Sequence, residues 1–238
     1  MESIGKTVAI ITAGGSGNRL PGKQKKQFRL LDGRPVLIIT LDAFLSHPRI
    51  DSIIVTLPIE DMGYFSHLLE ECYSEESPLD KVILCPGGNH RQDSVYNALQ
   101  HCPARTETVL IHDGVRPFVS AELLSALIEQ VHSDQAVIPV SPVKNTIKQV
   151  NGNLVVSTPA RETLVQVYTP QAFAYSLIKQ CYDLAREEGF YSTDDAALAE
   201  HYGYPVHTFT DTSANLKITD EQDLLIADFL LKHNSKKI

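Results

Sequence analysis

The chain has 238 residues with 29 acidic and 21 basic side chains, which gives a formal net charge of −8 at pH 7. This length can bury a core without disulfides or a structural metal, and the acidic balance argues against a nucleic-acid surface, which needs clustered Lys and Arg. No run reaches the roughly 18 to 20 apolar residues that cross a bilayer, and residues 1–12 precede glycines instead of a cleavage site. We therefore expect a cytoplasmic protein that binds neither nucleic acid nor membrane, with any phosphate chemistry confined to a local basic site.

Short β-rich segments alternate with amphipathic segments along the chain. Thr219 with Gln222 three residues later matches a capping box ahead of Leu224-Leu225-Ile226, and this pattern predicts the start of a last helix. Such alternation predicts an α/β fold, a Rossmann-like, mostly parallel twisted sheet flanked by helices, in one domain of residues 1–238. The predicted strands are residues 7–12, 52–57, 82–85, 109–111 and 136–140, and the other predicted helices are residues 36–46, 92–100, 121–132, 175–188 and 194–202.

One stretch interrupts the alternation. Residues 141–169 contain several prolines, the turn-forming sequence Asn151-Gly152-Asn153, and β-branched residues on both sides of that turn. The pattern predicts a protruding β-hairpin arm at about 141–168, and a long surface loop is the alternative. Because a projecting arm needs a partner subunit to cover its apolar face, we expect a homodimer.

The first strand ends in a glycine-rich segment, Ala13-Gly14-Gly15-Ser16-Gly17-Asn18-Arg19, with Lys26 a few residues further on. Glycines let backbone N–H groups turn toward phosphate oxygens, and basic side chains supply the compensating charge. This pattern favours a nucleoside-triphosphate loop in which Arg19 and Lys26 hold the triphosphate. A glycine-rich turn with solvated lysines remains the plainer alternative.

Two common phosphate motifs fit this segment poorly. A dinucleotide fingerprint needs Gly or Ala where Leu20 stands, so that the helix can pack closely on the strand. A P-loop ending at Gly22-Lys23 needs Ser or Thr as the next residue to bind magnesium, but that residue is Gln24, and Pro21 interrupts the loop. Leu20 thus argues against a nicotinamide oxidoreductase, and Gln24 argues against a P-loop enzyme.

A carboxylate follows the predicted strand at 109–111. Asp113 lies just beyond it, at the edge where open α/β sheets bind ligands, and its hard oxygen ligands suit Mg²⁺. Arg116, three residues later, is placed to contact the same anion. An N-cap or turn aspartate is the alternative for Asp113.

At this point seven ordered segments resemble the 2-C-methyl-D-erythritol 4-phosphate cytidylyltransferase family, from about Thr7 to the last helix. Asn145 stands before Thr146 where members of that family often have Asp, a departure on the acceptor side. The segments are residues 13–19, Lys26-Gln27-Phe28, residues 87–95, residues 112–117, Thr169-Pro170-Gln171, residues 193–196 and residues 215–219.

The resemblance implies a role for each matching residue. It implies catalysis by Arg19, Lys26 and Lys217 through positioning and charge stabilisation, with Asp113 as the magnesium ligand and CTP and a polyol phosphate as substrates. Several acceptor residues are implied to come from the arm of a partner subunit. The implied nucleotide-binding residues are Ala13, Gly14, Gly15, Gly17, Arg19, Lys26, Gly87, Gly88, Ser94, Asp113 and Gly114, and the substrate-binding residues are Arg116, Thr146, Arg161, Thr169, Thr193 and Lys217.

The expected activity is therefore transfer of CMP from CTP to 2-C-methyl-D-erythritol 4-phosphate, in the non-mevalonate route to isoprenoid precursors. Ribitol-5-phosphate cytidylyltransferase, which is similar in fold and in the glycine loop, is the closest alternative. Residues 163–169 before Pro170-Gln171, and the segment Thr193-Asp194-Asp195, resemble the methylerythritol enzyme more closely. A non-catalytic nucleotide-binding protein is a further alternative, which the combination of Arg19, Lys26, Asp113 and Lys217 disfavours.

Overall fold

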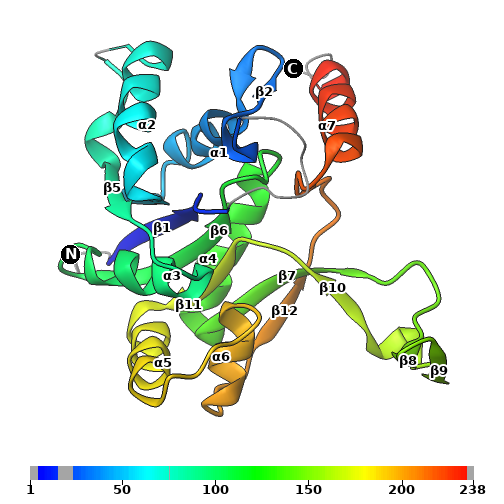
Figure 1. Cartoon of the computed structure of the whole chain (residues 1–238). Helices are drawn as coiled ribbons and strands as arrows, with labels where there is room; N and C mark the ends of the chain where they lie inside the picture. The colour runs from blue at the N-terminus through cyan, green and yellow to red at the C-terminus, as the bar shows by residue number, and fades with distance from the viewer. Residues whose placement is uncertain (1–4, 16–23, 75, 235–238) are drawn as a thin grey trace.

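The computed structural model describes residues 5–15, 24–74 and 76–234, and these form a mixed sheet with helices on both faces (Figure 1). The strand order is β10-β7-β11-β6-β1-β4-β5, and β12 pairs with the free side of β7. The large sheet contains β1 (Lys6–Thr12), β4 (Ser52–Leu57), β5 (Val82–Pro86), β6 (Thr106–Asp113), β7 (Ala136–Pro142), β10 (Val165–Val167), β11 (Gln171–Ala174) and β12 (His207–Thr210).

The sheet is mostly parallel, as the sequence predicts. β1 runs parallel to β4 and to β6, and β4 runs parallel to β5. β11 is one of two exceptions, because it lies antiparallel between β6 and β7. β10 is also antiparallel to β7, so the chain returns from the arm along β7 before it enters the sheet beside β6.

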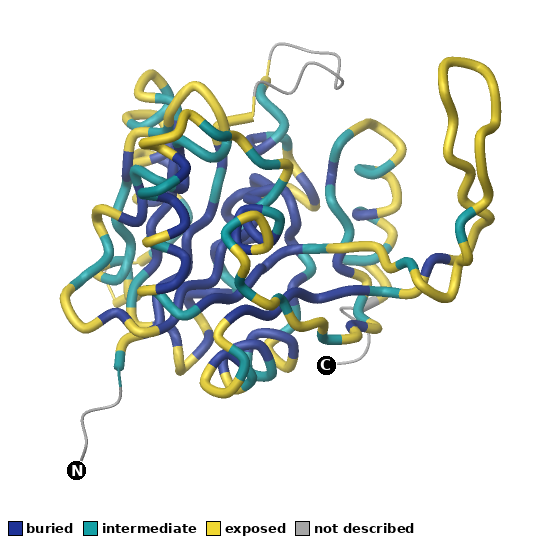
Figure 2. The backbone as a smooth tube through the Cα atoms, turned by 90° about the horizontal axis from the view of Figure 1, so that it is seen from below, coloured by how far each residue is buried: buried dark blue, intermediate teal, exposed yellow. Residues whose placement is uncertain are grey.

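Alternating side chains of the central strands enter two separate cores, because successive residues of a strand point to opposite faces. Ala9 and Ile11 of β1 join one core, and Val8 and Ile10 join the other. This burial on both faces explains why the parallel strands read as continuous apolar runs. Figure 2 shows the buried strands in the middle of the molecule.

Three helices cover each face. The first core contains residues of α1 (Val36–Leu45), α2 (Ile59–Cys72) and α4 (Ala121–Asp134), and the second contains residues of α3 (Arg91–Gln100), α5 (Tyr175–Glu188) and α6 (Asp195–His201). A smaller cluster places α7 (Glu221–Asn234) over the short hairpin of β2 (Leu30–Leu31) and β3 (Arg34–Pro35). No helix among the described residues is long and apolar enough to cross a membrane.

The start of α7 corrects one prediction. The prediction that Thr219 and Gln222 form a capping box is wrong, because the reciprocal hydrogen bonds at the start of α7 join Asp220 and Asp223. Asp223 N donates to Asp220 Oδ1 at 2.9 Å, and Asp220 N donates back to Asp223 Oδ2 at 3.1 Å. The Thr219 hydroxyl donates to the same Asp223 oxygen at 2.5 Å. The helix therefore begins one residue later than the sequence pattern places it.

The hairpin predicted within residues 141–168, hereafter the arm, is present. β8 (Gln149–Asn151) pairs antiparallel with β9 (Leu154–Ser157), and Asn151 lies opposite Leu154 across the turn. Gly152 has φ +58°, which a glycine adopts without strain at the first position of a tight hairpin turn. The arm projects from the body of the molecule (Figures 1 and 2). Its exposed apolar side chains are Ile147, Val150, Leu154, Val155, Val156, Val165 and Val167.

Candidate active site

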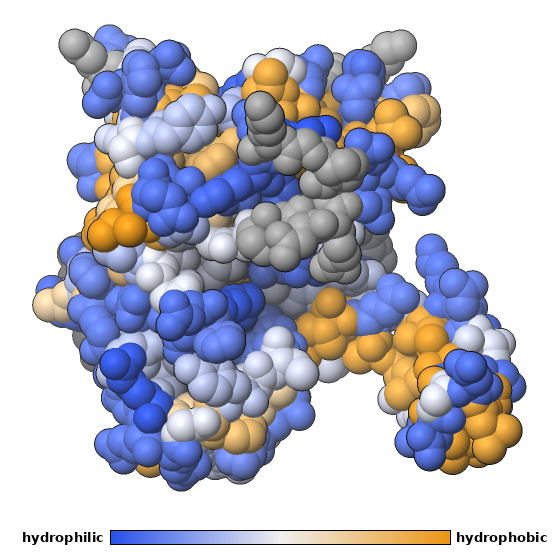
Figure 3. All heavy atoms as spheres, in the orientation of Figure 1, coloured by the Kyte–Doolittle hydropathy of each residue, from blue (hydrophilic) through white to orange (hydrophobic). Residues whose placement is uncertain are grey.

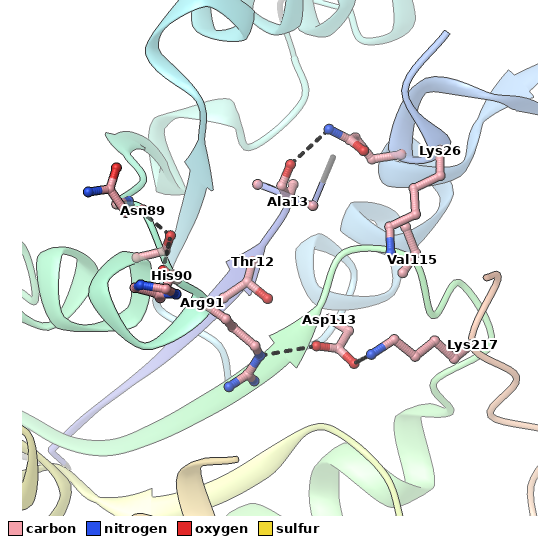
Figure 4. Close-up of a pocket in the computed structure, with 14 residues that line it drawn as sticks. Thr12, Ala13, Lys26, Asn89, His90, Arg91, Asp113, Val115 and Lys217 are labelled. Atoms are coloured by element: carbon pink, nitrogen blue, oxygen red, sulfur yellow. Dashed lines mark hydrogen bonds and ion pairs between the residues drawn. The ribbon is translucent and has the colours of Figure 1, made fainter. Parts of the chain in front are cut away.

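A cavity of about 420 Å³ opens where β1 and β6 end, opposite the N-terminus of α3 (Figure 4). The carboxyl ends of parallel strands are where open α/β sheets bind ligands. The cavity is lined by Thr12, Ala13, Gly14, Gly15, Lys26, Gln27, Gly88, Asn89, His90, Arg91, Ser94, Asp113, Val115 and Lys217.

Backbone hydrogen bonds between neighbouring strands fix the wall at the end of β1. Ala13 N donates to Thr56 O, and Gly114 N donates to Thr12 O, both at 2.9 Å. The buried Gln27 amide donates from Nε2 to Ala13 O at 2.9 Å, which ties the segment carrying Lys26 to this wall. A Cβ at Gly15 would stand 3.1 Å from Lys26 Cε, so the glycine gives the lysine side chain its room.

The N-terminus of α3 forms the opposite wall. Asp93 completes a capping interaction, because His90 N donates to its Oδ2 at 2.9 Å. Ser94 Oγ accepts from Gly88 N at 3.0 Å and donates to His90 O at 3.2 Å. A Cβ at Gly88 would stand 2.2 Å from the Cβ of Asp93, so only glycine fits this turn. Helix N-termini favour anions through their free N–H groups and dipole, so this wall suits a phosphorylated ligand.

Asp113 lies between three cations. Arg91 Nε is 3.3 Å from Oδ1, while Lys217 Nζ and Arg116 Nε are 2.8 and 3.4 Å from Oδ2. Burial would raise the pKa of Asp113, but Arg91 and Lys217, helped by Arg116, outweigh burial and hold that pKa well below its usual range. The carboxylate is therefore charged at neutral pH and sits in a local excess of positive charge.

Arg116 and Asn215 place Lys217 in the site. Arg116 Nη1 donates to Asn215 O at 2.9 Å, and the Asn215 side chain donates to Thr169 O at 2.7 Å. Ile218 N donates to Val115 O at 2.9 Å. Arg116 also lies over the ring of Tyr168, 5.5 Å from its centroid. These contacts hold the segment before α7 against the ends of β6 and β10.

His112 is linked to Asp113 through a shared hydrogen-bond partner, the Thr169 hydroxyl. His112 Nε2 lies 3.0 Å from Arg116 O, and because a carbonyl oxygen can only accept, Nε2 carries the proton. Nδ1 is then unprotonated and accepts a hydrogen bond from Thr169 Oγ1 at 3.1 Å. Asp113 N donates to the same Thr169 oxygen at 3.1 Å. Burial lowers the pKa of His112 to about 4, so the ring is neutral at pH 7 and acts here as a structural hydrogen-bonding group.

A second, smaller cavity of about 180 Å³ adjoins the first. The two share Arg91, Asp113 and Lys217. Gln171 and Asp194 form part of its floor, where Gln171 Nε2 donates to Asp194 Oδ2 at 2.8 Å. The smaller cavity is also lined by Arg116, Val167, Tyr168, Thr169 and Thr193.

The predicted site residues fall into five groups. Ala13, Gly14, Gly15, Lys26, Gly88, Ser94, Asp113 and Lys217 line the larger cavity, and Arg116, Thr169 and Thr193 line the smaller one with Asp113 and Lys217. Gly87 and Gly114 stand behind the walls, where a Cβ at Gly114 would be 2.9 Å from Leu37 Cδ1. Thr146 and Arg161 lie on the arm and line neither cavity. Gly17 and Arg19 lie outside the described residues.

Sequence reasoning assigned no role to several lining residues. Arg91 is the most important of them, because it contacts Asp113 and lines both cavities. Its place at the start of a helix after the Gly87-Gly88 turn was a usable signal, since basic side chains there face a bound anion. The other lining residues without a predicted role are Thr12, Gln27, Asn89, His90, Val115, Val167, Tyr168, Gln171 and Asp194.

The residues at this edge fit a magnesium ion only together with a phosphorylated ligand. Among the described residues, no group of three or more His, Cys, Asp or Glu gathers to hold a metal. Asp113 offers one carboxylate, and Mg²⁺ in nucleotide sites typically uses one or two carboxylates with substrate phosphates and water. A cage made by the protein alone does not fit the described residues.

The mostly parallel sheet and the basic cavity at its strand ends define an α/β protein that binds phosphorylated ligands. Residues 7–233 match the model of the family described as 2-C-methyl-D-erythritol 4-phosphate cytidylyltransferase. The chain belongs to that family.

Relatives that carry this family name are similar along almost their whole length. The Syntrophus aciditrophicus enzyme is 39% identical over 235 residues, covering 98% of this chain and 99% of its own, and that of Desulforamulus reducens is 40% identical with 98% of each covered. The structure of 4-diphosphocytidyl-2C-methyl-D-erythritol synthase from Anaerococcus prevotii has a TM-score of 0.82 at 33% identity, with 96% of each chain covered.

Proposed function

We propose that this chain transfers the cytidylyl group of CTP to 2-C-methyl-D-erythritol 4-phosphate, giving 4-CDP-2-C-methyl-D-erythritol and pyrophosphate. A phosphate oxygen of the acceptor forms a bond to the α-phosphorus of CTP, and the bond from that phosphorus to the β-phosphate oxygen breaks. The acceptor phosphate is already a nucleophile, so the reaction needs no strong general base. The main obstacle is repulsion between two anions in an in-line displacement.

The observation that carries the proposal is the pair of adjoining cavities that share Arg91, Asp113 and Lys217. The larger cavity suits the nucleotide, since it has the glycine-rich wall, Lys26 and the N-terminus of α3. The smaller one suits the acceptor phosphate. The shared cations then lie where charge develops, at the α-phosphorus between the two sites. Arg19, from the glycine loop, is assigned to the triphosphate together with Lys26.

Magnesium is proposed as the cofactor, held by Asp113 with the CTP phosphates and water. When bound, the ion supplies charge neutralisation for the phosphates and for the leaving pyrophosphate. The chain contributes the orientation of the Asp113 carboxylate, which the surrounding cations fix on both oxygens. A carboxylate that is charged at neutral pH is the form such a ligand requires.

A homodimer that pairs through the arm is proposed as the working form. Leu154 is 73% exposed and Val156 is 59% exposed, and Figure 3 shows apolar side chains gathered on the arm. Exposed apolar groups of this kind favour an interface. Thr146 and Arg161 lie on the arm, away from both cavities, so a partner's site is where they would meet an acceptor. The cytoplasm, where CTP is made, is the proposed location.

Pyrophosphate release tests the function directly. The purified protein is supplied with CTP, Mg²⁺ and either 2-C-methyl-D-erythritol 4-phosphate or D-ribitol 5-phosphate, beside Lys26→Ala and Asp113→Ala. The exposed α7 pair Lys232 and Asp228 supplies matched controls, Lys232→Ala and Asp228→Ala. We expect turnover of the methylerythritol acceptor alone, lost in the two site variants and kept in the two controls. Preference for ribitol phosphate would assign the alternative activity, and no turnover with either acceptor would overturn the proposal.

A further inference from the structure

Asp195 is a buried carboxylate next to the site that lines neither cavity. It is the first residue of α6, and its side chain has no exposed surface. Arg91 Nη1 and Nη2 donate to its two oxygens at 3.0 and 2.8 Å, and the Tyr182 hydroxyl donates to Oδ1 at 2.5 Å. The N-terminus of a helix further favours a negative charge at this place.

The pairing fixes the direction of the third donor of Arg91. A guanidinium is planar, so holding both terminal nitrogens on one carboxylate also fixes the plane in which Nε–H points. In Arg91 that N–H points to Asp113 Oδ1, with Nε 3.3 Å away. Arg91 thereby joins α6 and α5, through Asp195 and Tyr182, to the end of β6.

The two oxygens of Asp113 have different partners. Oδ1 faces Arg91, whose terminal nitrogens are bound by Asp195. Oδ2 faces Lys217 at 2.8 Å and Arg116 at 3.4 Å. Among these cations Lys217 has the most exposed side chain, 39% against 32% for Arg91 and 10% for Arg116. Lysine also carries a single compact charge on a flexible stem. Lys217 is therefore the partner that can leave Asp113, and Arg91 is the one that stays.

We propose that Asp195 is a positioning residue of this site: through Arg91 it holds Asp113 by Oδ1, so that ligand binding exchanges partners at Oδ2 alone. Lys217 then swings from Oδ2 toward the phosphates of the bound ligand while the carboxylate keeps its orientation. Without Asp195, Arg91 is free to follow the anionic ligand and Asp113 loses its fixed side. This proposal rests on the proposed function for its ligand, CTP, but its geometry is present in the protein alone.

The first test observes Arg91 without any turnover. In ¹⁵N-labelled protein, the Arg91 Nε–H resonance is assigned by its absence in Arg91→Lys. We expect a slowly exchanging signal in the wild type that persists when CTP and Mg²⁺ are added. We expect the signal to shift or broaden in Asp195→Asn, and to remain in Asp183→Asn, which alters a half-exposed carboxylate paired with Lys179 on α5. A wild-type signal that is lost to rapid solvent exchange when CTP binds would show that Arg91 leaves Asp113 and would overturn the proposal, even if Asp195→Asn does not fold.

The second test separates positioning from mere stability. Circular dichroism and thermal unfolding first establish which variants fold. In a folded Asp195→Asn we expect kcat to fall about 10- to 100-fold with little change in KM for CTP, the range found for outer partners that orient a functional ligand. Asp195→Glu, which keeps the charge, is expected to recover most of that loss. Wild-type kcat in Asp195→Asn would overturn the proposal. An inactive wild type with the expected Arg91 signal would instead refute the proposed function and leave the arrangement of Arg91 intact.

Discussion

The end of β6 and the arm differ in burial and in how many contacts hold them. Asp113, His112 and Arg116 are buried, and contacts from β1, β6, α3 and the segment before α7 converge on this group. The arm is a two-stranded hairpin whose β8 and β9 residues are all exposed. A lone hairpin is at best marginally stable in water. The body thus supplies the walls of the larger cavity and most of those of the smaller one, to which the end of the arm adds Val167 and Tyr168, whereas the hairpin of the arm leaves its apolar side chains uncovered.

The difference separates two kinds of functional requirement. The cavity at the strand ends needs fixed charges at defined distances, and several ties to each side chain supply that precision. The proposed role of the arm requires that it project from the body and carry an apolar surface. A short hairpin turned at Gly152 provides both features. Substitutions at the strand ends should therefore change chemistry and folding, and substitutions on the arm should change assembly.

Removing the carboxylate at the centre of the strand ends should give the largest effect. Asp113→Asn leaves Arg91, Arg116 and Lys217 without their shared anion and removes the proposed metal ligand. We expect kcat to fall at least about 10²- to 10³-fold, the loss typical of one preorganised charge-stabilising group. Pyrophosphate release measures it, with Asp228→Asn as the exposed control. The oligomer mass should not change, and a change would mean that the two regions are coupled.

The next effect concerns pH and is confined to the body. Because burial lowers the pKa of His112 to about 4 from an ordinary 6.5, the unfolded chain binds more protons than the folded one between these values. The stability due to this neutral ring is fully present above about pH 6.5 and is lost as the pH falls toward 4. At 1.36 kcal/mol per pKa unit, the loss amounts to about 3 kcal/mol.

Urea unfolding at pH 7 and pH 4.5 measures this loss, and NMR titration of the His112 ring measures the pKa directly. His47, whose pKa burial also lowers, contributes in the same direction, so His47→Gln serves as the background for the comparison. A His112 ring that titrates near 6.5 in the folded protein would contradict the burial argument.

The sequence predicts the elements whose pattern is local. The strands around residues 7–12 and 52–57 are rich in β-branched residues, and the helix at Tyr175–Glu188 has the predicted bounds. The sequence reading missed α2, because only Phe65, Leu68 and Leu69 are buried among charged and polar residues. β11 and β12 were also missed, since four-residue strands are defined by their partners across the sheet more than by their own residues.

The same limit applies to the site. Asp113 was predictable because its position after a buried strand is visible in the sequence. The contact of Arg91 with Asp195 joins residues 104 positions apart, and no local spacing reveals it. His112 is a second example: burial lowers its pKa and keeps the ring neutral, and the hydrogen bonds that orient the ring come from Arg116 O and from Thr169, a residue 57 positions away.

A smaller effect is expected from crowding the wall behind the cavity. Gly114→Ala would place a Cβ 2.9 Å from Leu37 Cδ1 and 3.0 Å from Thr12 O. Because a backbone oxygen moves little, we expect a loss of about 1 to 3 kcal/mol in the free energy of unfolding, the usual cost of overpacking. Gly63→Ala is the matched control, since a Cβ there meets nothing within 4 Å and the residue lies inside α2. That variant should be neutral or up to about 1 kcal/mol more stable. Equal stability losses in both would reject the steric explanation.

The smallest effect on folding, and the sharpest test of the contrast, comes from the arm. Leu154 on the arm and Leu225 on α7 are each 73% exposed, so Leu154→Asp and Leu225→Asp make the same change on equally exposed sites. For the folded body, we expect each to alter the free energy of unfolding by no more than about 0.5 kcal/mol when compared at concentrations where the chain is monomeric. Light scattering should nevertheless show a dimer for the wild type and Leu225→Asp and a monomer for Leu154→Asp, because a charge on the arm would have to be buried unpaired in the proposed interface. An unchanged dimer in Leu154→Asp would mean that the arm's apolar face is covered in some other way, and a monomeric wild type would mean that the arm works without a partner of its own kind.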